Sequence, residues 1–154
     1  MDRKKNIFDK MGSLIPGYRG YAERDGRMNC DKLLRVGLSD RLSIVEGVLY
    51  DRINQAIKIK DKNQMRSLED CRKQLNTFNY KVRHAPYGET SFFGDAQIKD
   101  EELLQIYLLD LELAEHINEL SLNTLDIGVT ELISLTNRAQ ESLQKRNDYI
   151  KGFK

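Results

Sequence analysis

Hydrophobic residues recur every three or four positions along most of the chain, which is the spacing of one face of an α-helix. The longest stripe lasts about seven helical turns and consists of Cys30, Leu34, Leu38, Leu42, Val45, Leu49, Ile53 and Ala56. It predicts a first long helix over about residues 22–60. Such a helix would be about 58 Å long, more than the later helices can cover, so we expect it to project or to bend.

Three further helices follow from the same periodicity. The second stripe runs from Met65 to Val82 and should stop before Pro86, because proline disfavours helical geometry in the residue that precedes it. The third segment, about residues 100–122, is apolar over a broad surface, as expected for a helix in the centre of a bundle. The fourth begins near Val129 and ends in basic residues and a glycine, which are typical of a helix C-terminus.

The predicted fold class is therefore all-α, an antiparallel four-helix bundle with a long first helix and a short N-terminal amphipathic segment. A chain of 154 residues with two prolines and no tryptophan fits a single helical domain that buries a substantial core. We divide it into residues 1–21, an N-terminal amphipathic segment with an aromatic loop, and residues 22–154, the helical bundle.

Charge is distributed unevenly, although the net charge is only +1. Residues 1–62 carry a formal charge of +5 and residues 63–154 carry −4, with ten carboxylates between Asp95 and Glu131. An acidic helical hairpin packed beside more basic helices would explain this asymmetry. Nucleic-acid binding needs clustered Lys and Arg to neutralise phosphates, so the balance argues against DNA or RNA as a partner.

The two cysteines, Cys30 and Cys71, lie on the apolar stripes of different predicted helices. A chain reversal near Lys62 would set them roughly 35 Å apart in antiparallel packing, whereas a disulfide needs Cα atoms within about 7 Å. We therefore expect two buried free thiols and a reducing, cytoplasmic environment. The N-terminus lacks the apolar run of a signal peptide, and we expect no transmembrane helix.

One group of possible metal ligands lies on the third predicted helix, where Glu112, His116 and Glu119 share a face. Di-iron bundles place a Glu-x-x-His pair on each of two helices, and neither His84 nor His116 has a glutamate three residues before it. The alternative is a solvated acidic face. A carboxylate-metal enzyme centred on these residues is the third functional hypothesis, and we predict no cofactor.

Two aromatic loops punctuated by glycine are more unusual, one ahead of the first long helix and one after the second helix. Their candidate partner-binding residues are Tyr18, Arg19, Tyr21, Tyr87, Phe92 and Phe93. In an up-down bundle both loops lie at the same end. Exposed aromatic and arginine side chains are typical anchors of protein interfaces. Alternatively, the aromatic rings cap the open end of the core.

The same loops carry a resemblance to an uncharacterised family of small bacterial all-helical proteins. It rests on Pro16-Gly17-Tyr18-Arg19-Gly20-Tyr21, Glu23-Arg24, Arg27, Asp31-Lys32-Leu33-Leu34-Arg35, Tyr80-Lys81-Val82-Arg83-His84-Ala85-Pro86-Tyr87-Gly88 and Phe92-Phe93. The resemblance spans about residues 14–120. It implies a bacterial, cytoplasmic protein, and the family has no activity to carry over. Where the family often has a bulky residue after Tyr-Gly, this chain has Glu89-Thr90-Ser91.

The N-terminal residues 2–15 form a short basic amphipathic segment, and such a segment can lie on an anionic membrane surface. Its candidate membrane-contacting residues are Lys4, Lys5, Phe8 and Met11. The same segment can equally fold back on the bundle, and Asp2 and Asp9 dilute its positive charge.

Our first functional hypothesis is a non-enzymatic protein-interaction or scaffold module that binds another protein through its aromatic end loops. The alternative is a peripheral membrane protein that docks through its N-terminal basic segment. Pairing of the long first helix with a second copy, which would make a homodimer, stays open.

Overall fold

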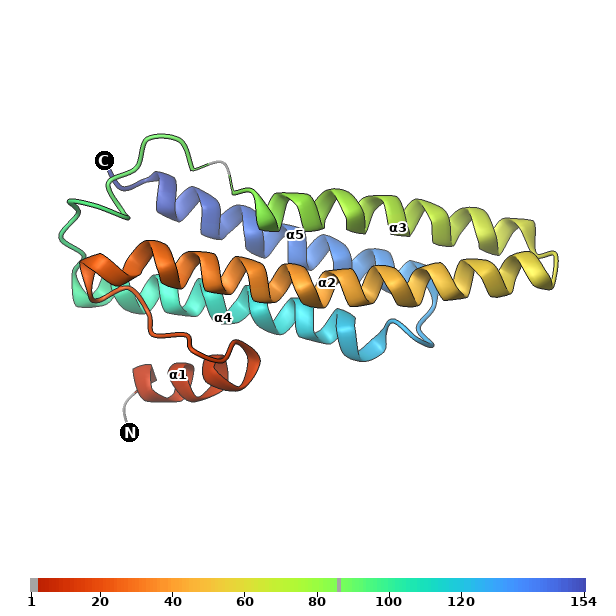
Figure 1. Ribbon diagram of the computed structural model, residues 1–154, viewed down its shortest axis with the longest axis horizontal. Helices are drawn as coiled ribbons and strands as arrows, with labels where there is room; N and C mark the ends of the chain where they lie inside the picture. The colour runs from red at the N-terminus through yellow and green to blue at the C-terminus, as the bar shows by residue number, and fades with distance from the viewer. Residues whose placement is uncertain (1–2, 86) are drawn as a thin grey trace.

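The computed structural model describes residues 3–85 and 87–154 (Figure 1). Within these ranges the chain forms five α-helices, one short 3-10 turn and no strand. Pro86, which belongs to the family resemblance, and residues 1–2 of the segment 1–21 lie outside the described residues. The prediction of an all-α fold is confirmed.

The elements follow one another as α1 (Arg3–Leu14), η1 (Arg24–Gly26), α2 (Arg27–Lys58), α3 (Lys62–Arg83), α4 (Asp100–Asn123) and α5 (Val129–Lys151). Helix α2 packs mainly against α3, and α4 packs mainly against α5. The two pairs meet where α2 contacts α4 and α3 contacts α5, while α1 lies against α4 (Figure 1). This packing is consistent with a helical bundle.

The predicted long first helix is present, but it begins at Arg27 rather than near residue 22. The 3-10 turn η1 occupies the intervening residues and ends at Gly26. The 32 residues of α2 form one continuous helix of about 48 Å. The end where α2 meets α3 projects beyond the link between α4 and α5 (Figure 1). Of the two expectations for this helix, the structure shows projection.

The core runs along the bundle and is built from the predicted stripes. Helix α4 buries residues on most of its circumference, which agrees with a central position. Each fully buried leucine or isoleucine contributes about 1.5–3 kcal/mol relative to an exposed one. Cys30 and Cys71 are both buried and free, so the prediction of two unpaired thiols is confirmed.

Candidate functional site

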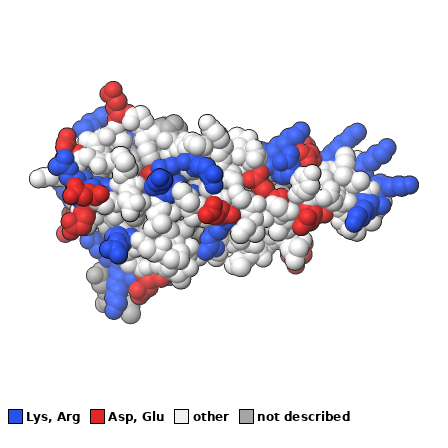
Figure 2. Space-filling view, in the orientation of Figure 1, with Lys and Arg blue, Asp and Glu red and all other residues white. Residues whose placement is uncertain are grey.

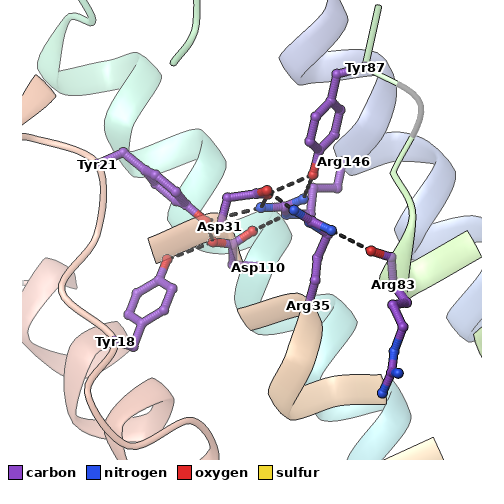
Figure 3. Close-up of polar contacts among 8 residues, drawn as sticks. All are labelled: Tyr18, Tyr21, Asp31, Arg35, Arg83, Tyr87, Asp110 and Arg146. Carbon is purple, nitrogen blue, oxygen red and sulfur yellow. Dashed lines mark hydrogen bonds and ion pairs between the residues drawn. The ribbon is translucent and has the colours of Figure 1, made fainter. Parts of the chain in front are cut away.

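The most unusual feature of the structure is a charged group in the core at the end of the bundle that carries both aromatic loops (Figure 3). Arg146 of α5 is fully buried, and its side chain has the lowest exposure of any arginine in the described core. Its Nε donates to Asp110 Oδ1 at 2.5 Å, and its Nη2 donates to Asp31 Oδ1 at 2.7 Å. All three guanidinium nitrogens are used, because Nη1 donates to the Tyr87 hydroxyl at 2.5 Å and Nη2 also donates to the Tyr21 hydroxyl at 3.0 Å.

The two carboxylates that face Arg146 come from different helices. Asp110 of α4 accepts hydrogen bonds at Oδ2 from the hydroxyls of Tyr18 at 2.7 Å and Tyr21 at 2.5 Å. Asp31 of α2 accepts from the Tyr87 hydroxyl at 2.6 Å and from Arg35 Nε at 2.8 Å. A buried charge is tolerated when it is paired and hydrogen-bonded. Both carboxylates meet that requirement.

We call Tyr18, Tyr21, Asp31, Tyr87, Asp110 and Arg146 the end cluster. Its members come from α2, α4, α5 and both end loops, so it connects three helices to two loops. Arg35 extends the connection to α3, because its Nη1 donates to the backbone carbonyl of Arg83 at 2.5 Å. The end cluster therefore fastens parts of the chain that are far apart in sequence.

The first loop reaches the end cluster because two of its glycines adopt backbone conformations that are unfavourable for other residues. Gly17 and Gly20 have φ angles of +91° and +82°. Residues other than glycine rarely adopt this left-handed region. A Cβ on Gly20 would lie 2.7 Å from Phe8 Cζ and from the Tyr107 hydroxyl oxygen. That hydroxyl accepts the backbone N–H of Tyr21 at 3.1 Å. The loop is therefore pressed directly against α1 and α4.

A second arginine joins the two loops to each other. Arg27, buried at the start of α2, donates from Nε to the carbonyl of Tyr21 at 2.9 Å. Its Nη1 donates to the carbonyls of Ala96 at 2.8 Å and Phe92 at 3.3 Å. Ring contacts add to this, since the Phe92 ring lies 5.2 Å from the rings of both Tyr21 and Phe153.

The electrostatics of the end cluster shift the pKa values of several of its groups. Burial, reinforced by Asp110, raises the pKa of Tyr21 and of Tyr18 well above the ordinary value. Burial would raise the pKa of Asp31, but Arg146, Tyr87 and Arg35 outweigh it and lower that pKa. Burial would likewise lower the pKa of Arg146, and Asp110 with its neighbours raises it instead. All these shifts lead away from neutral pH, whereas general acid–base catalysis needs a pKa near the working pH.

The structure places the six candidate partner-binding residues in different settings. Tyr18, Tyr21 and Phe92 are buried, and Tyr87 and Phe93 are half-buried against the core. Arg19 alone of the six is exposed. The aromatic rings therefore cap the end of the core, which is the second of the two interpretations that the sequence left open. Three of the five aromatic candidates are thus buried and do not form an exposed surface.

The candidate membrane residues are also divided. Met11 is fully buried, and Phe8 is half-buried with its ring 4.8 Å from Tyr107 and 5.7 Å from Tyr18. Lys5 is exposed, and Lys4 pairs with Asp100 at 3.9 Å. The apolar face of α1 is used inside the protein. Of the two alternatives for this segment, the structure shows the one in which it folds back on the bundle.

The three candidate metal ligands do not converge. His116 Nδ1 lies 2.6 Å from Ser142 Oγ, and Glu112 pairs with Lys145 at 3.4 Å. Glu119 lines a separate hollow near the end of α4. Among residues 3–85 and 87–154, no three His, Cys, Asp or Glu side chains are grouped so that they could hold a metal ion.

Sequence reasoning missed the residues that matter most to this site, namely Asp31, Asp110 and Arg146. Asp31 entered only through the family resemblance, and neither Asp110 nor Arg146 was among the candidate residues. A signal was present. Asp110 lies between leucines on a helix that is apolar nearly all round, and Arg146 lies three residues after Leu143 and four before Ile150 on a buried stripe. Charges in such positions need a buried partner.

A hollow of about 270 Å³ lies beside the end cluster, between the first end loop and the start of α2. The residues that line it are Gly17, Arg19, Gly20, Ala22, Glu23, Gly26, Asn29, Cys30 and Leu33. Burial, together with Asp110, raises the pKa of the Cys30 thiol to about 11. The thiolate is the reactive form of cysteine, so Cys30 contributes an apolar wall rather than a nucleophile.

Comparisons with known proteins give no relative, since no family model matches the chain and no match was found among curated proteins or solved structures. The class of protein therefore rests on the fold, which is a helical bundle with a buried charged cluster at one end. Along the described residues, none of the helices combines the length and apolar character that crossing a bilayer requires.

Proposed function

We propose that this protein is a non-enzymatic interaction module that binds another protein through its first end loop. The contact surface is the hollow between that loop and the start of α2, with Arg19 and Leu33 as the anchoring side chains. The observation that carries the proposal is the inward direction of Tyr18 and Tyr21. Their hydroxyls bind Asp110, which leaves the loop backbone and Arg19 to form its outer face.

The rigidity of this loop supports a binding role. A surface that is ordered before binding loses less conformational entropy when a partner attaches. The loop is held by the end cluster on one side and by Arg27 on the other. Leu33 and Cys30 give the hollow an apolar wall, and Arg19 supplies a positive charge beside it. Such a surface suits a partner segment that carries one apolar side chain next to an acidic one.

The end cluster supports a structural rather than a catalytic role for its own residues. Arg146 and Asp31 form an ion pair with 0% and 2% side-chain exposure. Their pKa values, and those of the tyrosines around them, are shifted away from neutrality. We propose further that the four long helices form an antiparallel up-down-up-down bundle, which the pairing of α2 with α3 and of α4 with α5 supports.

The test is affinity capture from native cell lysate with matched variants. Arg19→Glu combined with Leu33→Asp should abolish recovery of a specific protein that the wild type captures. Arg138→Glu, which reverses a charge on an exposed position of α5, is the control and should leave capture unchanged. All three proteins must first show the same helical content and unfolding midpoint. Equal recovery by the double variant and the wild type would contradict the proposed surface.

A further inference from the structure

The end of the bundle opposite the end cluster exposes apolar and basic side chains. Here α2 passes into α3 through a short turn, and we call residues 57–66 the distal tip. Ile57 and Ile59 are 53% and 64% exposed. Figure 2 shows Lys and Arg side chains gathered at this projecting end. The basic residues of the distal tip are Lys58, Lys60, Lys62 and Arg66, and all four are exposed.

The positive charge of the distal tip exceeds its negative charge, with four basic residues and one carboxylate. None of its four basic side chains takes part in an ion pair or hydrogen bond with the described residues. Its only carboxylate, Asp61, caps α3 by accepting the backbone N–H of Gln64 at 3.1 Å. Nearby, Glu69 is paired with Arg72 at 2.6 Å. The distal tip therefore presents a net positive charge to an external partner.

A hollow at the distal tip is lined by both apolar and basic residues. The hollow has a volume of about 410 Å³, with Ala56, Ile57 and Met65 among its apolar lining residues. Lys60, Lys62 and Arg66 line it as well, together with Asp61. Apolar side chains surrounded by Lys and Arg form the pattern by which proteins bind the interface of an anionic bilayer.

One backbone angle adds an independent observation. Lys60 has a φ of +61°, and it is the one residue other than glycine with a positive φ in the described chain. This position follows the end of α2, where glycine is the usual residue because it adopts the left-handed conformation without steric cost. A lysine here is less favourable for folding than glycine, because its Cβ makes the left-handed conformation sterically costly.

We propose that the distal tip is a docking site for an anionic lipid bilayer. Ile57 and Ile59 enter the interface between headgroup and acyl regions, and the four basic side chains contact lipid phosphates. The projection of the α2–α3 end beyond α4 and α5 (Figure 1) lets this end reach a flat surface without interference from the rest of the bundle. The surface that we propose for a partner protein lies at the other end and stays free.

The experiment is co-sedimentation of the full chain with vesicles of phosphatidylcholine alone and of phosphatidylcholine mixed with phosphatidylglycerol. We expect binding to the anionic vesicles only, and release as salt is added. Lys58→Gln with Lys60→Gln and Lys62→Gln should weaken the partition coefficient by about fivefold for each lysine removed. The matched control makes the same charge change on α1, with Arg3→Gln, Lys5→Gln and Lys10→Gln, and should bind nearly as well as the wild type.

Two single-site tests separate docking from folding. Lys60→Gly should raise the unfolding midpoint and yet weaken binding about fivefold, whereas a purely structural lysine would change the midpoint alone. Ile59→Ser should weaken binding in high salt as well as in low salt, because it removes an apolar contact.

Several results would overturn the proposal. These are absence of binding to anionic vesicles, equal binding of the tip variant and the wild type, or loss of binding in the α1 control instead. Binding to soluble polyglutamate that depends on the same lysines, without binding to vesicles, would also overturn it and would indicate an acidic protein as the partner.

Discussion

At the scale of single residues, Arg146 carries the largest expected energetic effect. Removal of one partner from a buried ion pair leaves uncompensated charge and typically costs about 3–5 kcal/mol. We expect Arg146→Met to lower the free energy of unfolding by about that amount, because it leaves Asp110 without its cation and Asp31 with Arg35 alone. Urea unfolding followed by circular dichroism measures the change.

Two comparisons make the Arg146 result specific. Arg138→Met, at an exposed position of the same helix, should change the free energy of unfolding little. The loss caused by Arg146→Met should shrink at acid pH, because Asp31, whose pKa Arg146 lowers, no longer needs a cation once it is protonated. A loss that is the same at neutral and acid pH would mean that packing, not charge, is responsible.

The tyrosines of the end cluster predict how stability responds to alkali. Burial raises the pKa values of Tyr18, Tyr21 and Tyr87. A group whose pKa is higher in the folded protein contributes stability that is fully present below its unfolded pKa and is lost as the pH rises from there through the folded pKa. We expect the free energy of unfolding to fall above about pH 10. Tyr21→Phe should be less stable at neutral pH but lose less on going to alkali, and an unchanged pH profile would refute this assignment.

Asp31 predicts the opposite response in acid. Burial acts to raise its pKa, but Arg146, Tyr87 and Arg35 lower it below the ordinary value. Its contribution is present above the unfolded pKa of about 4 and is lost as the pH falls through the folded value. Asp31→Asn should therefore flatten the acid limb of the stability profile measured by urea unfolding. A profile as steep as that of the wild type would contradict this.

At the scale of elements, the packing of α1 and the first end loop can be tested with two glycines. Gly20→Ala should destabilise by several kcal/mol, on the order of 2–4, because it combines a positive φ with overpacking against Phe8 and Tyr107. Gly12→Ala is the matched control within α1, where an added Cβ meets nothing within 4 Å. It should stabilise by about 0.5–1 kcal/mol through helix propensity. Thermal unfolding distinguishes the two, and equal effects would contradict the described contact.

The helices themselves could largely be predicted from sequence. Burial of one helix face requires hydrophobic residues at every third or fourth position, and this spacing is visible in the sequence. The third helix was expected over about residues 100–122 and is Asp100–Asn123, and the fourth begins at Val129 as expected. The start of α2 was placed too early because the residues before it, Arg24–Gly26, form a 3-10 turn instead of the first turn of the α-helix.

The site was harder to predict because its partners are distant in sequence. Periodicity gives the face of a helix on which Asp110 or Arg146 lies, but it does not say which residue of another helix lies opposite. Tyr18 and Asp110 are 92 positions apart, and Tyr21 and Arg146 are 125 apart. The aromatic loops could be located from their composition. Whether their rings point inward or outward depends on those distant carboxylates.

At the scale of the whole molecule, the protein has two unlike ends. One end is fixed by the end cluster, Arg27 and the aromatic rings, and the other projects as a basic hairpin. The exposed surface of the first end loop and the distal tip are therefore held apart by the length of the bundle. The two proposed contact surfaces are therefore compatible, because both can be occupied at the same time.

The measurement that tests the central claim most directly is native-state hydrogen exchange at single amides. The claim is that the end loops are held as rigidly as the bundle itself. We predict that the amides of Tyr21 and Ser91, bonded to the Tyr107 hydroxyl and the Phe153 carbonyl, are protected nearly as well as those of α2. Arg146→Met should lower the protection of these two amides more than that of the α2 amides. Rapid exchange of both loop amides in the wild type, beside protected helices, would contradict the claim.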